Sequence, residues 1–380
     1  MKKTIFITLI CLMTAATAQA QWLPGKSCTS TADAMMERAI EHMVNLEGPF
    51  AVGMANAALM IDSDCGTAHL LKASLSLGGQ FGDQAEKLEA IDTESLTRNE
   101  RAWHTLMMNT PDDWQGARQT AAEENPGVPL FEFWAAMAMD NSTDAMIAYI
   151  DEFPEYASPA YNMLSYAYAQ GMSVDQDLEK AIETIEKGIA AHDGPNAYDS
   201  KAEHLAEMGD YENAFQAQLT ALNYAAGPSA YSQNAGIYWR NSNRDAWADS
   251  IRAYTEERIG YTMNNDMDAM MGMMSETIAN TSCNSNMGPC QELNPDEVEE
   301  NTMYTWDEWE VGDIYVTFNE EMNMAITNFI SRGSYTMNDS GEEVAYHTRA
   351  SEVWVLENGW KLAHSNFAPL PDGAGLPGEQ

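Results

Sequence analysis

The sequence predicts an α-helical solenoid followed by an α+β domain in which helices cover a curved antiparallel sheet. Three observations predict it. Apolar residues recur at spacings of three and four from about residue 29 to residue 244, as they do in amphipathic helices. Within that region one helical pattern occurs twice in succession. Nearer the C-terminus, two apolar runs flank Asn358-Gly359, the dipeptide that most strongly indicates a two-residue β-hairpin.

Residues 1–20 have the features of a signal peptide. Lys2-Lys3 form a basic start, Ile5–Met13 an apolar run, and Ala18-Gln19-Ala20 a cleavage site. The residue before Cys11 is not the small residue that a lipoprotein signal requires at that position. Because no apolar run is long enough to span a bilayer, we expect a periplasmic or secreted protein without a lipid anchor.

The chain carries 58 acidic and 19 basic side chains, which gives a formal net charge of −39. So acidic a surface repels nucleic acids and anionic membranes, and we expect neither as a partner. No segment has the D-x-D-x-D-G spacing of a calcium loop. A zinc site at the C-terminal cysteines would need further ligands nearby, yet no histidine lies between His204 and His347. The sequence therefore indicates no metal site and no cofactor.

Four cysteines follow the expected signal peptide: Cys28, Cys65, Cys283 and Cys290. An even number of cysteines in an exported chain favours disulfides. Four cysteines can pair in three ways. We favour Cys28–Cys65 together with Cys283–Cys290, because each bond then stays within its own half of the chain.

Two consecutive units, Ser158–Gly194 and Gly194–Gly227, each consist of a helical pattern, a Gly-containing turn and a second helical pattern. In the second unit Ala202, Ala214 and Ala221 stand at positions where the two helices of a hairpin approach closely and small side chains are needed. This pattern resembles the tetratricopeptide repeat. The resemblance implies a stack of helical hairpins whose concave face binds a protein or peptide partner.

Upstream of these units the same periodicity is present in a more degenerate form, and short polar breaks separate the segments. The expected helices are Thr31–Leu46, Ala51–Ile61, Thr67–Leu77, Thr97–Asn109, Asp113–Glu123, Pro129–Met139 and Ser142–Glu152. We therefore assign residues 28–243 to one helical repeat domain.

A boundary near Asn241-Ser242-Asn243 separates that domain from residues 245–369. Helical patterns come first in this second region and strand patterns follow. The expected helices are Ala246–Tyr261 and Met267–Ser275, and the expected strands are Ile314–Phe318, Met324–Ile330, Ala345–Leu356 and Trp360–Phe367. Thr281–Glu300 is predicted to be a loop, and the Pro- and Gly-rich residues 370–380 a disordered tail.

The C-terminal hairpin has two apolar faces. A two-residue turn at Asn358-Gly359 would pair Val355 with Leu362 and Val353 with His364. In that register one face carries Val353, Val355, Trp360, Leu362 and His364, and the other carries Trp354, Leu356, Ala363 and Phe367. Because both faces are apolar, other elements must cover each of them.

Several short segments of this region form a recognisable set. They are Asn265-Asp266, Met324-Ala325-Ile326, Thr348-Arg349, Val353-Trp354-Val355, Gly359-Trp360-Lys361 and His364. The set is similar to the SnoaL-like group of the nuclear-transport-factor-2-like superfamily, which also contains ketosteroid isomerases and the association domain of a calmodulin-dependent kinase. The resemblance implies a cone-shaped domain that holds a small apolar ligand or forms a homodimer. Members of the group often end H-x-H-x-S, and the run from His364 to Ala368 lacks the second His and the Ser.

Isomerase-type members of that superfamily use a carboxylate base in an apolar pocket, where burial retunes its pKa. The resemblance makes Asp266, Asp268 and His347 the catalytic candidates. The candidates for lining a ligand pocket are Tyr261, Tyr315, Trp354 and His364. None of these residues belongs to a diagnostic constellation. We therefore expect a non-enzymatic binding protein, and the alternative is a small-molecule isomerase, cyclase or dehydratase acting in the cone.

Overall fold

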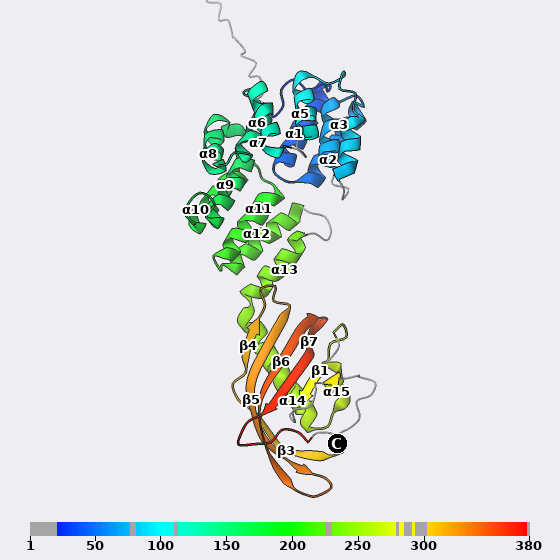
Figure 1. Cartoon of the computed structure of the whole chain (residues 1–380), viewed down its shortest axis with the longest axis vertical. Helices are drawn as coiled ribbons and strands as arrows, with labels where there is room; N and C mark the ends of the chain where they lie inside the picture. Colours follow the sequence, from blue (N-terminus) through cyan, green and yellow to red (C-terminus); the bar gives the residue numbers. More distant parts are fainter. Residues whose placement is uncertain are drawn as a thin grey trace, which may run out of the picture. The chain divides into compact units, whose positions relative to one another are not determined.

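The computed structural model describes residues 21–76, 81–109, 113–224, 230–278, 281–284, 291–292 and 302–377. The expected signal peptide and Cys290 lie outside these residues. The chain divides into two compact units, Met1–Ser232 and Gln233–Gln380, here called the helical unit and the C-terminal unit (Figure 1). The division falls within α13 (Ala230–Ser242), ahead of the boundary expected near Asn241, whose position stays a prediction. No helix among the described residues is long and apolar enough to cross a membrane.

The helical unit consists of helices packed against their neighbours in sequence. They are α1 (Ser30–Val44), α2 (Gly48–Ile61), α3 (Gly66–Ser74), α4 (Phe81–Glu89), α5 (Arg98–Asn109), α6 (Trp114–Glu124), α7 (Pro129–Met137), α8 (Ser142–Glu152), the 3-10 turn η1 (Pro154–Tyr156), α9 (Ser158–Gln170), α10 (Leu178–Ala191), α11 (Pro195–Glu207) and α12 (Tyr211–Tyr224). The predicted helical solenoid is confirmed. The helix α4 was not predicted. Among its residues 84–89, Leu88 is the one buried apolar side chain, and a single residue gives no periodicity.

The two predicted repeat units are the hairpins α9–α10 and α11–α12. Small residues stand where their helices approach, as expected. Ala202, Ala214 and Ala221 have no solvent exposure. In the first hairpin, a Cβ added at Gly188 would lie 3.3 Å from Cβ of Tyr161, so the helices meet there without room for a larger residue.

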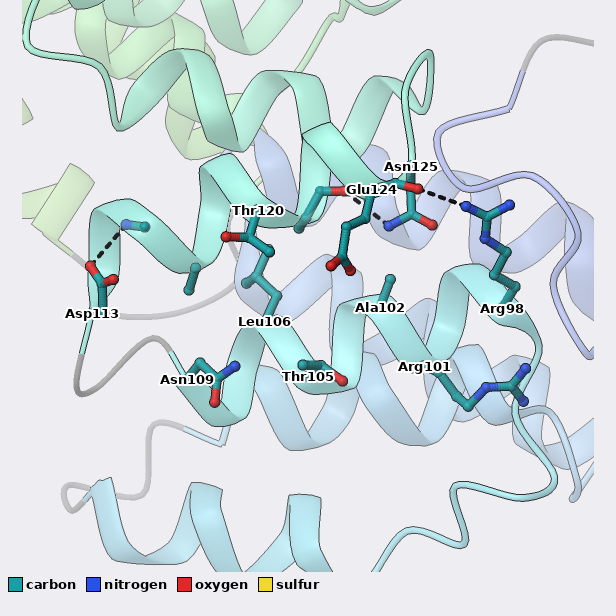
Figure 2. A pocket seen from close by; sticks show the side chains of 13 residues that line it. Arg98, Arg101, Ala102, Thr105, Leu106, Asn109, Asp113, Thr120, Glu124 and Asn125 are labelled. Atoms are coloured by element: carbon teal, nitrogen blue, oxygen red, sulfur yellow. Dashed lines mark hydrogen bonds between the residues drawn. The ribbon is translucent and has the colours of Figure 1, made fainter.

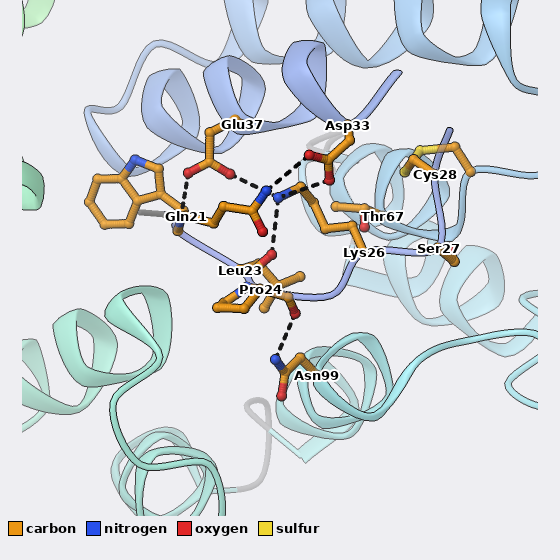
Figure 3. A network of polar contacts seen from close by, with 12 residues as sticks. Gln21, Leu23, Pro24, Lys26, Ser27, Cys28, Asp33, Glu37, Thr67 and Asn99 are labelled. Atoms are coloured by element: carbon orange, nitrogen blue, oxygen red, sulfur yellow. Dashed lines mark hydrogen bonds and ion pairs between the residues drawn. A yellow bond between two sulfur atoms is a disulfide. The ribbon is translucent and has the colours of Figure 1, made fainter. Parts of the chain in front are cut away.

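Residues 21–28 form an irregular segment that side chains hold in place (Figure 3). The buried ammonium of Lys26 lies 2.8 Å from the carboxylate of Glu37 and 3.2 Å from that of Asp33, both on α1. Lys26 Nζ also donates to the carbonyl of Leu23 at 3.0 Å. A buried charge needs such pairing, and here the pairing attaches the segment to the first helix.

The predicted Cys28–Cys65 disulfide is confirmed and joins this segment to the start of α3. Cys283 is also disulfide-bonded, and its expected partner Cys290 lies outside the described residues. Beside the first disulfide, the buried carboxylate of Glu100 accepts hydrogen bonds from the backbone N–H of Ser27 at 3.0 Å and from Thr67 Oγ1 at 2.5 Å. Burial raises the pKa of Glu100, but these hydrogen bonds hold it below its ordinary value.

In the part of the C-terminal unit that the structure describes, two helices and one sheet follow α13. The helices are α14 (Arg244–Met263) and α15 (Met267–Gly272), and the strands are β1 (Thr281–Asn284), β2 (Gln291–Glu292), β3 (Tyr304–Val311), β4 (Tyr315–Phe318), β5 (Met324–Met337), β6 (Glu343–Glu357) and β7 (Gly359–Pro369). The sheet order is β2-β1-β7-β6-β5-β3, with β4 also paired to β5. All pairs are antiparallel except β1 with β7. The predicted α+β cone is confirmed.

The helix α14 packs against one face of this sheet, the inner face (Figure 1). Its buried residues Ala248, Ile251, Thr255, Arg258 and Ile259 follow a helical spacing and form one stripe. The side chains that alternate with the inner ones point to the opposite, outer face. On β6, Tyr346, Ala350 and Trp354 are therefore inner residues.

The register of the C-terminal hairpin differs from the prediction. Asn-Gly favours a type I′ turn, in which both central residues have positive φ. In the structure Gly359 alone has positive φ, at 98°, so the turn is of a different type. The structure pairs Leu356 with Trp360 and Trp354 with Leu362, and an irregularity at Val353/Trp354 restores the expected pairing of Val353 with His364. Trp360 and Leu362 thus join Trp354 on the inner face, where all three are buried.

Two segments expected to be irregular contribute to the sheet. Within the predicted loop Thr281–Glu300, β1 pairs in parallel with β7. Residues 370–377, expected to be disordered, lie against β6. There the N–H of Ala374 donates to the carbonyl of Ala345 at 2.9 Å, and the carbonyl of Ala374 accepts from the N–H of His347 at 3.1 Å. Neither segment has a strand-like alternation of apolar and polar residues, so the sequence alone did not indicate that it pairs with the sheet. The neighbouring strands provide its hydrogen-bond partners.

A buried histidine provides a pH-dependent test of the predicted repeats. His204 on α11 is 1% exposed, and its Nε2 lies 2.9 Å from Ser165 Oγ on α9. Burial lowers the pKa of His204 from its ordinary 6.5 to about 4. As the pH falls, His204 becomes protonated in the unfolded chain before it does in the folded chain. The stability that its neutral form provides is therefore complete above pH 6.5 and decreases as the pH falls toward 4.

We therefore expect the free energy of unfolding to decrease as the pH is lowered from 6.5 to 4. His204 should contribute up to about 1.4 kcal/mol per pH unit to this slope. Replacing it by a side chain that does not titrate, His204→Gln, should remove that part of the slope. Denaturant unfolding across this pH range measures it. His69→Gln, at an exposed position, is the control and should keep the parent slope. Identical slopes for His204→Gln and the parent would contradict a neutral, buried imidazole.

Candidate functional site

The helical unit has a cleft of about 520 Å³ between α5 and α6 (Figure 2). The cleft forms because α6 presents short side chains to it. Gly116, Ala117 and Ala121 line that wall at helical spacing. On the facing wall α5 places the exposed residues Arg101 and Thr105 one turn apart. Short side chains on one helix opposite polar ones on the other leave a solvent-filled groove.

The two ends of this cleft carry side chains of opposite charge. Arg98 and Arg101 lie at one end, in the first turn of α5, and Asp113 lies at the other end, where it caps α6 (Figure 2). Arg98 Nη2 donates to the carbonyl of Glu124 at 2.6 Å, and Arg101 donates to the carbonyl of Leu96. A guanidinium has five N–H donors, so both arginines keep donors for a further acceptor. The carboxylate of Glu124 points into the middle of the groove.

The inner face of the C-terminal unit is lined with aromatic rings. Trp306 and Trp309 stack with centroids 4.3 Å apart, and Tyr346 lies edge-on to Trp306 at 5.0 Å. Phe367 lies 5.9 Å from Trp309. Contacts of this kind hold the β3 end of the sheet over the end of α14. The interior described here is largely occupied by its own side chains.

A charged pair crosses this interior. Glu352 on β6 is fully buried, and Arg258 Nη2 lies 2.5 Å from its Oε1, although the pair lacks the alignment of a hydrogen bond. Oε2 of Glu352 accepts hydrogen bonds from Thr255 Oγ1 at 3.2 Å, Thr327 Oγ1 at 3.4 Å and Trp354 Nε1 at 3.1 Å. Because Oε2 accepts hydrogen bonds and Oε1 is paired with Arg258, this carboxylate has a structural role and is not free to act as a base. Arg258 Nε is buried without a hydrogen-bond partner among the described residues.

The three catalytic candidates do not meet at one site. Asp266 is exposed and caps α15, where its Oδ1 accepts from Ala269 N–H at 3.1 Å. Asp268 is exposed in the first turn of the same helix. His347 lies on the outer face of β6, and its Nδ1 is 2.5 Å from Asp372 in the segment that covers it. Their role in catalysis stays a prediction.

The four candidates for a ligand pocket are also spread over the unit. Trp354 is fully buried on the inner face. Tyr261 donates its hydroxyl to Glu257 at 2.5 Å along α14. Tyr315 is 69% exposed and borders a shallow hollow that Arg252 of α14 also lines. His364 is half-buried on the outer face, and its Nδ1 lies 2.6 Å from Thr281 Oγ1.

Within the described residues, one set of three side chains lies close enough together to share a metal ion: His42, Glu47 and His192, all in the helical unit. Burial raises the pKa of Glu47, but hydrogen bonds to His192 and His42 hold it below its ordinary value. Burial lowers the pKa of His192, but its contacts with Glu41 and Glu47 raise it to about 9.

Sequence reasoning did not single out Arg98 and Arg101, the Arg258–Glu352 pair or the histidine cluster. Arg258 could have been found, because the spacing of apolar residues in its helix puts it on the buried stripe. Nothing local to His192 indicates that it meets a residue 145 positions earlier.

No family model matches the sequence, and no curated protein matches it. A thermophilic TPR protein from Thermus thermophilus is similar over 55% of this chain and 98% of its own, with 14% identity and a TM-score of 0.26. A ketosteroid isomerase-like protein from Erwinia carotovora is similar over 32% of this chain and 93% of its own, with 13% identity and a TM-score of 0.27. An NTF2-like protein from Rhodospirillum rubrum is similar over 31% of this chain and 97% of its own, with 15% identity and a TM-score of 0.26. Likenesses of this size assign neither a family nor an activity to the chain.

Proposed function

We propose that this chain is an exported binding protein whose helical unit holds a peptide segment in the α5–α6 cleft. The observation that carries the proposal is the pair Arg98 and Arg101 at one end of that cleft. Export is supported by the basic, apolar and small-residue pattern of residues 1–20. The Cys28–Cys65 disulfide fits the same compartment, because such bonds persist where the surroundings are oxidising.

The charges indicate which peptides fit. Guanidinium groups bind carboxylates with strong, directional hydrogen bonds. The chain as a whole carries a net charge of −39 and repels long acidic stretches. A peptide with a single carboxylate, such as a free C-terminus, gains the local attraction of Arg98 and Arg101 and meets little of that repulsion. The carboxylate of Glu124 then faces the peptide backbone and can accept hydrogen bonds from its N–H groups.

Removing both arginines should weaken this binding. Each hydrogen bond to a charged group contributes about 1.5–3 kcal/mol, so the loss of one from each arginine in Arg98→Ala with Arg101→Ala should raise the dissociation constant at least about 100-fold. Fluorescence anisotropy of the mature chain against a library of short peptides, each with a free or an amidated C-terminus, measures it.

Arg38→Ala removes an exposed arginine of the same unit and should leave binding unchanged. Amidation of the peptide should reproduce the effect of the double variant. Equal affinities for the parent, the double variant and both peptide forms would refute a carboxylate site in this cleft.

For the C-terminal unit, the outer face of the sheet supports self-association. Apolar side chains are exposed there on neighbouring strands: Tyr315 at 69%, Ile326 at 41%, Met324 at 40% and Ile330 at 36%. The residues of β5 in this set alternate with inner ones, so they share one face. A contiguous exposed apolar set of this kind marks an interaction surface, and a second copy of the chain offers a matching one.

Native mass spectrometry of the mature chain tests the homodimer. We expect a dimer, and Ile326→Lys should convert it to a monomer because a charge cannot be buried unpaired in the interface. Ile278→Lys, at a 47% exposed isoleucine elsewhere in the unit, should stay dimeric. A monomer that carries an added small mass would instead favour a ligand in the interior, where Arg258 Nε lacks a partner among the described residues. A bare monomer would contradict both roles.

An isomerase, cyclase or dehydratase remains the alternative function. It would require a carboxylate or histidine facing a pocket. Asp266 and Asp268 are exposed, and His347 is covered on the outer face. The buried carboxylate of Glu352 is engaged by Thr255, Thr327, Trp354 and Arg258. The geometry therefore favours binding over catalysis.

A further inference from the structure

Two histidines and a glutamate from distant parts of the helical unit meet at one point. The ligand atoms of His42, Glu47 and His192 lie within 4.8 Å of one another. His42 Nδ1 is 2.5 Å from Glu47 Oε2, and His192 Nε2 is 3.0 Å from the same oxygen. His42 is in the last turn of α1, Glu47 begins α2, and His192 ends α10.

The backbone is shaped to bring these groups together. Leu46 has a φ of 62°, and Glu47 N–H donates to the carbonyl of His42 at 2.8 Å, which folds the end of α1 back on itself. Beside this turn, a Cβ added at Gly194 would lie 2.0 Å from Glu47 Oε1 and 2.6 Å from His192 Nε2, so the lack of a side chain at Gly194 leaves the space that these two groups occupy. The backbone turn after α1 thus positions Glu47, and the glycine at 194 lets its carboxylate meet His192.

The second nitrogen of His192 has its own carboxylate partner. Its Nδ1 lies 3.4 Å from Glu41 Oε1, while its Nε2 faces Glu47. A histidine that binds a metal through one nitrogen almost always donates from the other to a carboxylate or carbonyl, which fixes its orientation and tautomer. Glu41 supplies that outer partner here.

The burial of the three groups fits an ion held at the edge of the unit. The side chain of Glu47 is fully buried, that of His192 is 9% exposed and that of His42 is 19% exposed. A cation could enter from the His42 side and keep one position open to solvent. The described cysteines do not compete for it, because Cys28, Cys65 and Cys283 are in disulfides.

We propose that His42 Nδ1, Glu47 and His192 Nε2 form a binding site for a divalent transition-metal ion of the zinc class, with Glu41 orienting His192. Two imidazoles and a carboxylate are ligands that suit Zn²⁺, whereas Ca²⁺ and Mg²⁺ prefer oxygen atoms only. Metal–ligand distances of about 2.0–2.1 Å place tetrahedral donors about 3.3 Å apart. The two separations between a histidine nitrogen and Glu47 Oε2, 2.5 Å and 3.0 Å, are shorter than that by under about 1 Å, and all three donors lie within 4.8 Å of one another. Rotation of the outermost ligand, His42, can supply the difference. The ion takes the place of the protons now held between the imidazoles and Glu47.

This site is independent of the peptide cleft. It would connect the α1–α2 turn to the turn after α10, and so close a span of 145 residues. An ion that binds the folded chain only raises the free energy of unfolding by mass action. The open position at the ion also leaves room for a ligand from a partner.

Isothermal titration of the metal-free mature chain with Zn²⁺ tests the proposal, with Mg²⁺ as the control ion. We expect one Zn²⁺ per chain and no saturable uptake of Mg²⁺. The double variant His42→Gln with His192→Gln should weaken Zn²⁺ binding by at least about 100-fold, more than the loss of an outer partner does. His69→Gln removes an exposed histidine and should bind as the parent does.

Glu41→Gln keeps all three ligands and provides a variant in which the fold is undisturbed, since its carboxylate is 37% exposed. It should weaken Zn²⁺ about 10-fold by removing the outer partner of His192. Co²⁺ in place of Zn²⁺ should give the visible absorption of a four-coordinate ion in the parent and lose it in the double variant. The proposal is overturned if the parent takes up no Zn²⁺ saturably, or if the double variant and Glu41→Gln bind it as the parent does.

Discussion

The structure depends on the requirement that a buried carboxylate be fully paired. The chain has 58 acidic residues, and Glu47, Glu100 and Glu352 are almost completely buried, at 2%, 0% and 0% exposure. An unpaired charge in such a position costs several kcal/mol, so each carboxylate must collect donors. The donors come from distant segments. Glu47 engages a histidine 145 residues away, Glu100 engages Ser27, 73 residues earlier, and Glu352 engages Thr255, 97 residues earlier.

These contacts explain how the functional surfaces are positioned. Glu100 anchors the buried side of α5 to the N-terminal segment and the Cys28–Cys65 disulfide, while Arg98 and Arg101 of the same helix stay exposed at the cleft. Glu352 holds α14 to the inner face of the sheet, and the apolar side chains of β5 on the opposite, outer face form the surface proposed for self-association. A rigid interior and an accessible surface on the same element are what a binding protein needs, because little order must then be created on binding.

Much of the fold could be predicted from local pattern. Ala202, Ala214 and Ala221 indicated close helix contacts that the structure confirms. The hairpin was found from Asn358-Gly359, but its register was not, because only Gly359 takes a positive φ. The strand β3 was missed because a bulge lets Trp306 and Trp309 both point inward although they are three residues apart, which breaks the alternation of a strand. The candidate sites depend on pairs such as Glu47 with His192, and no local pattern reports a meeting across 145 residues.

Equilibrium unfolding of glutamate-to-glutamine variants tests the central claim most directly. Glu47→Gln, Glu100→Gln and Glu352→Gln each keep the size of the side chain but remove the charge that its donors surround. Each should lower the free energy of unfolding by about 1–3 kcal/mol at neutral pH. The exposed control Glu179→Gln should stay within about 0.5 kcal/mol of the parent. If all three buried variants have the same free energy of unfolding as the control, paired carboxylates do not organise this protein.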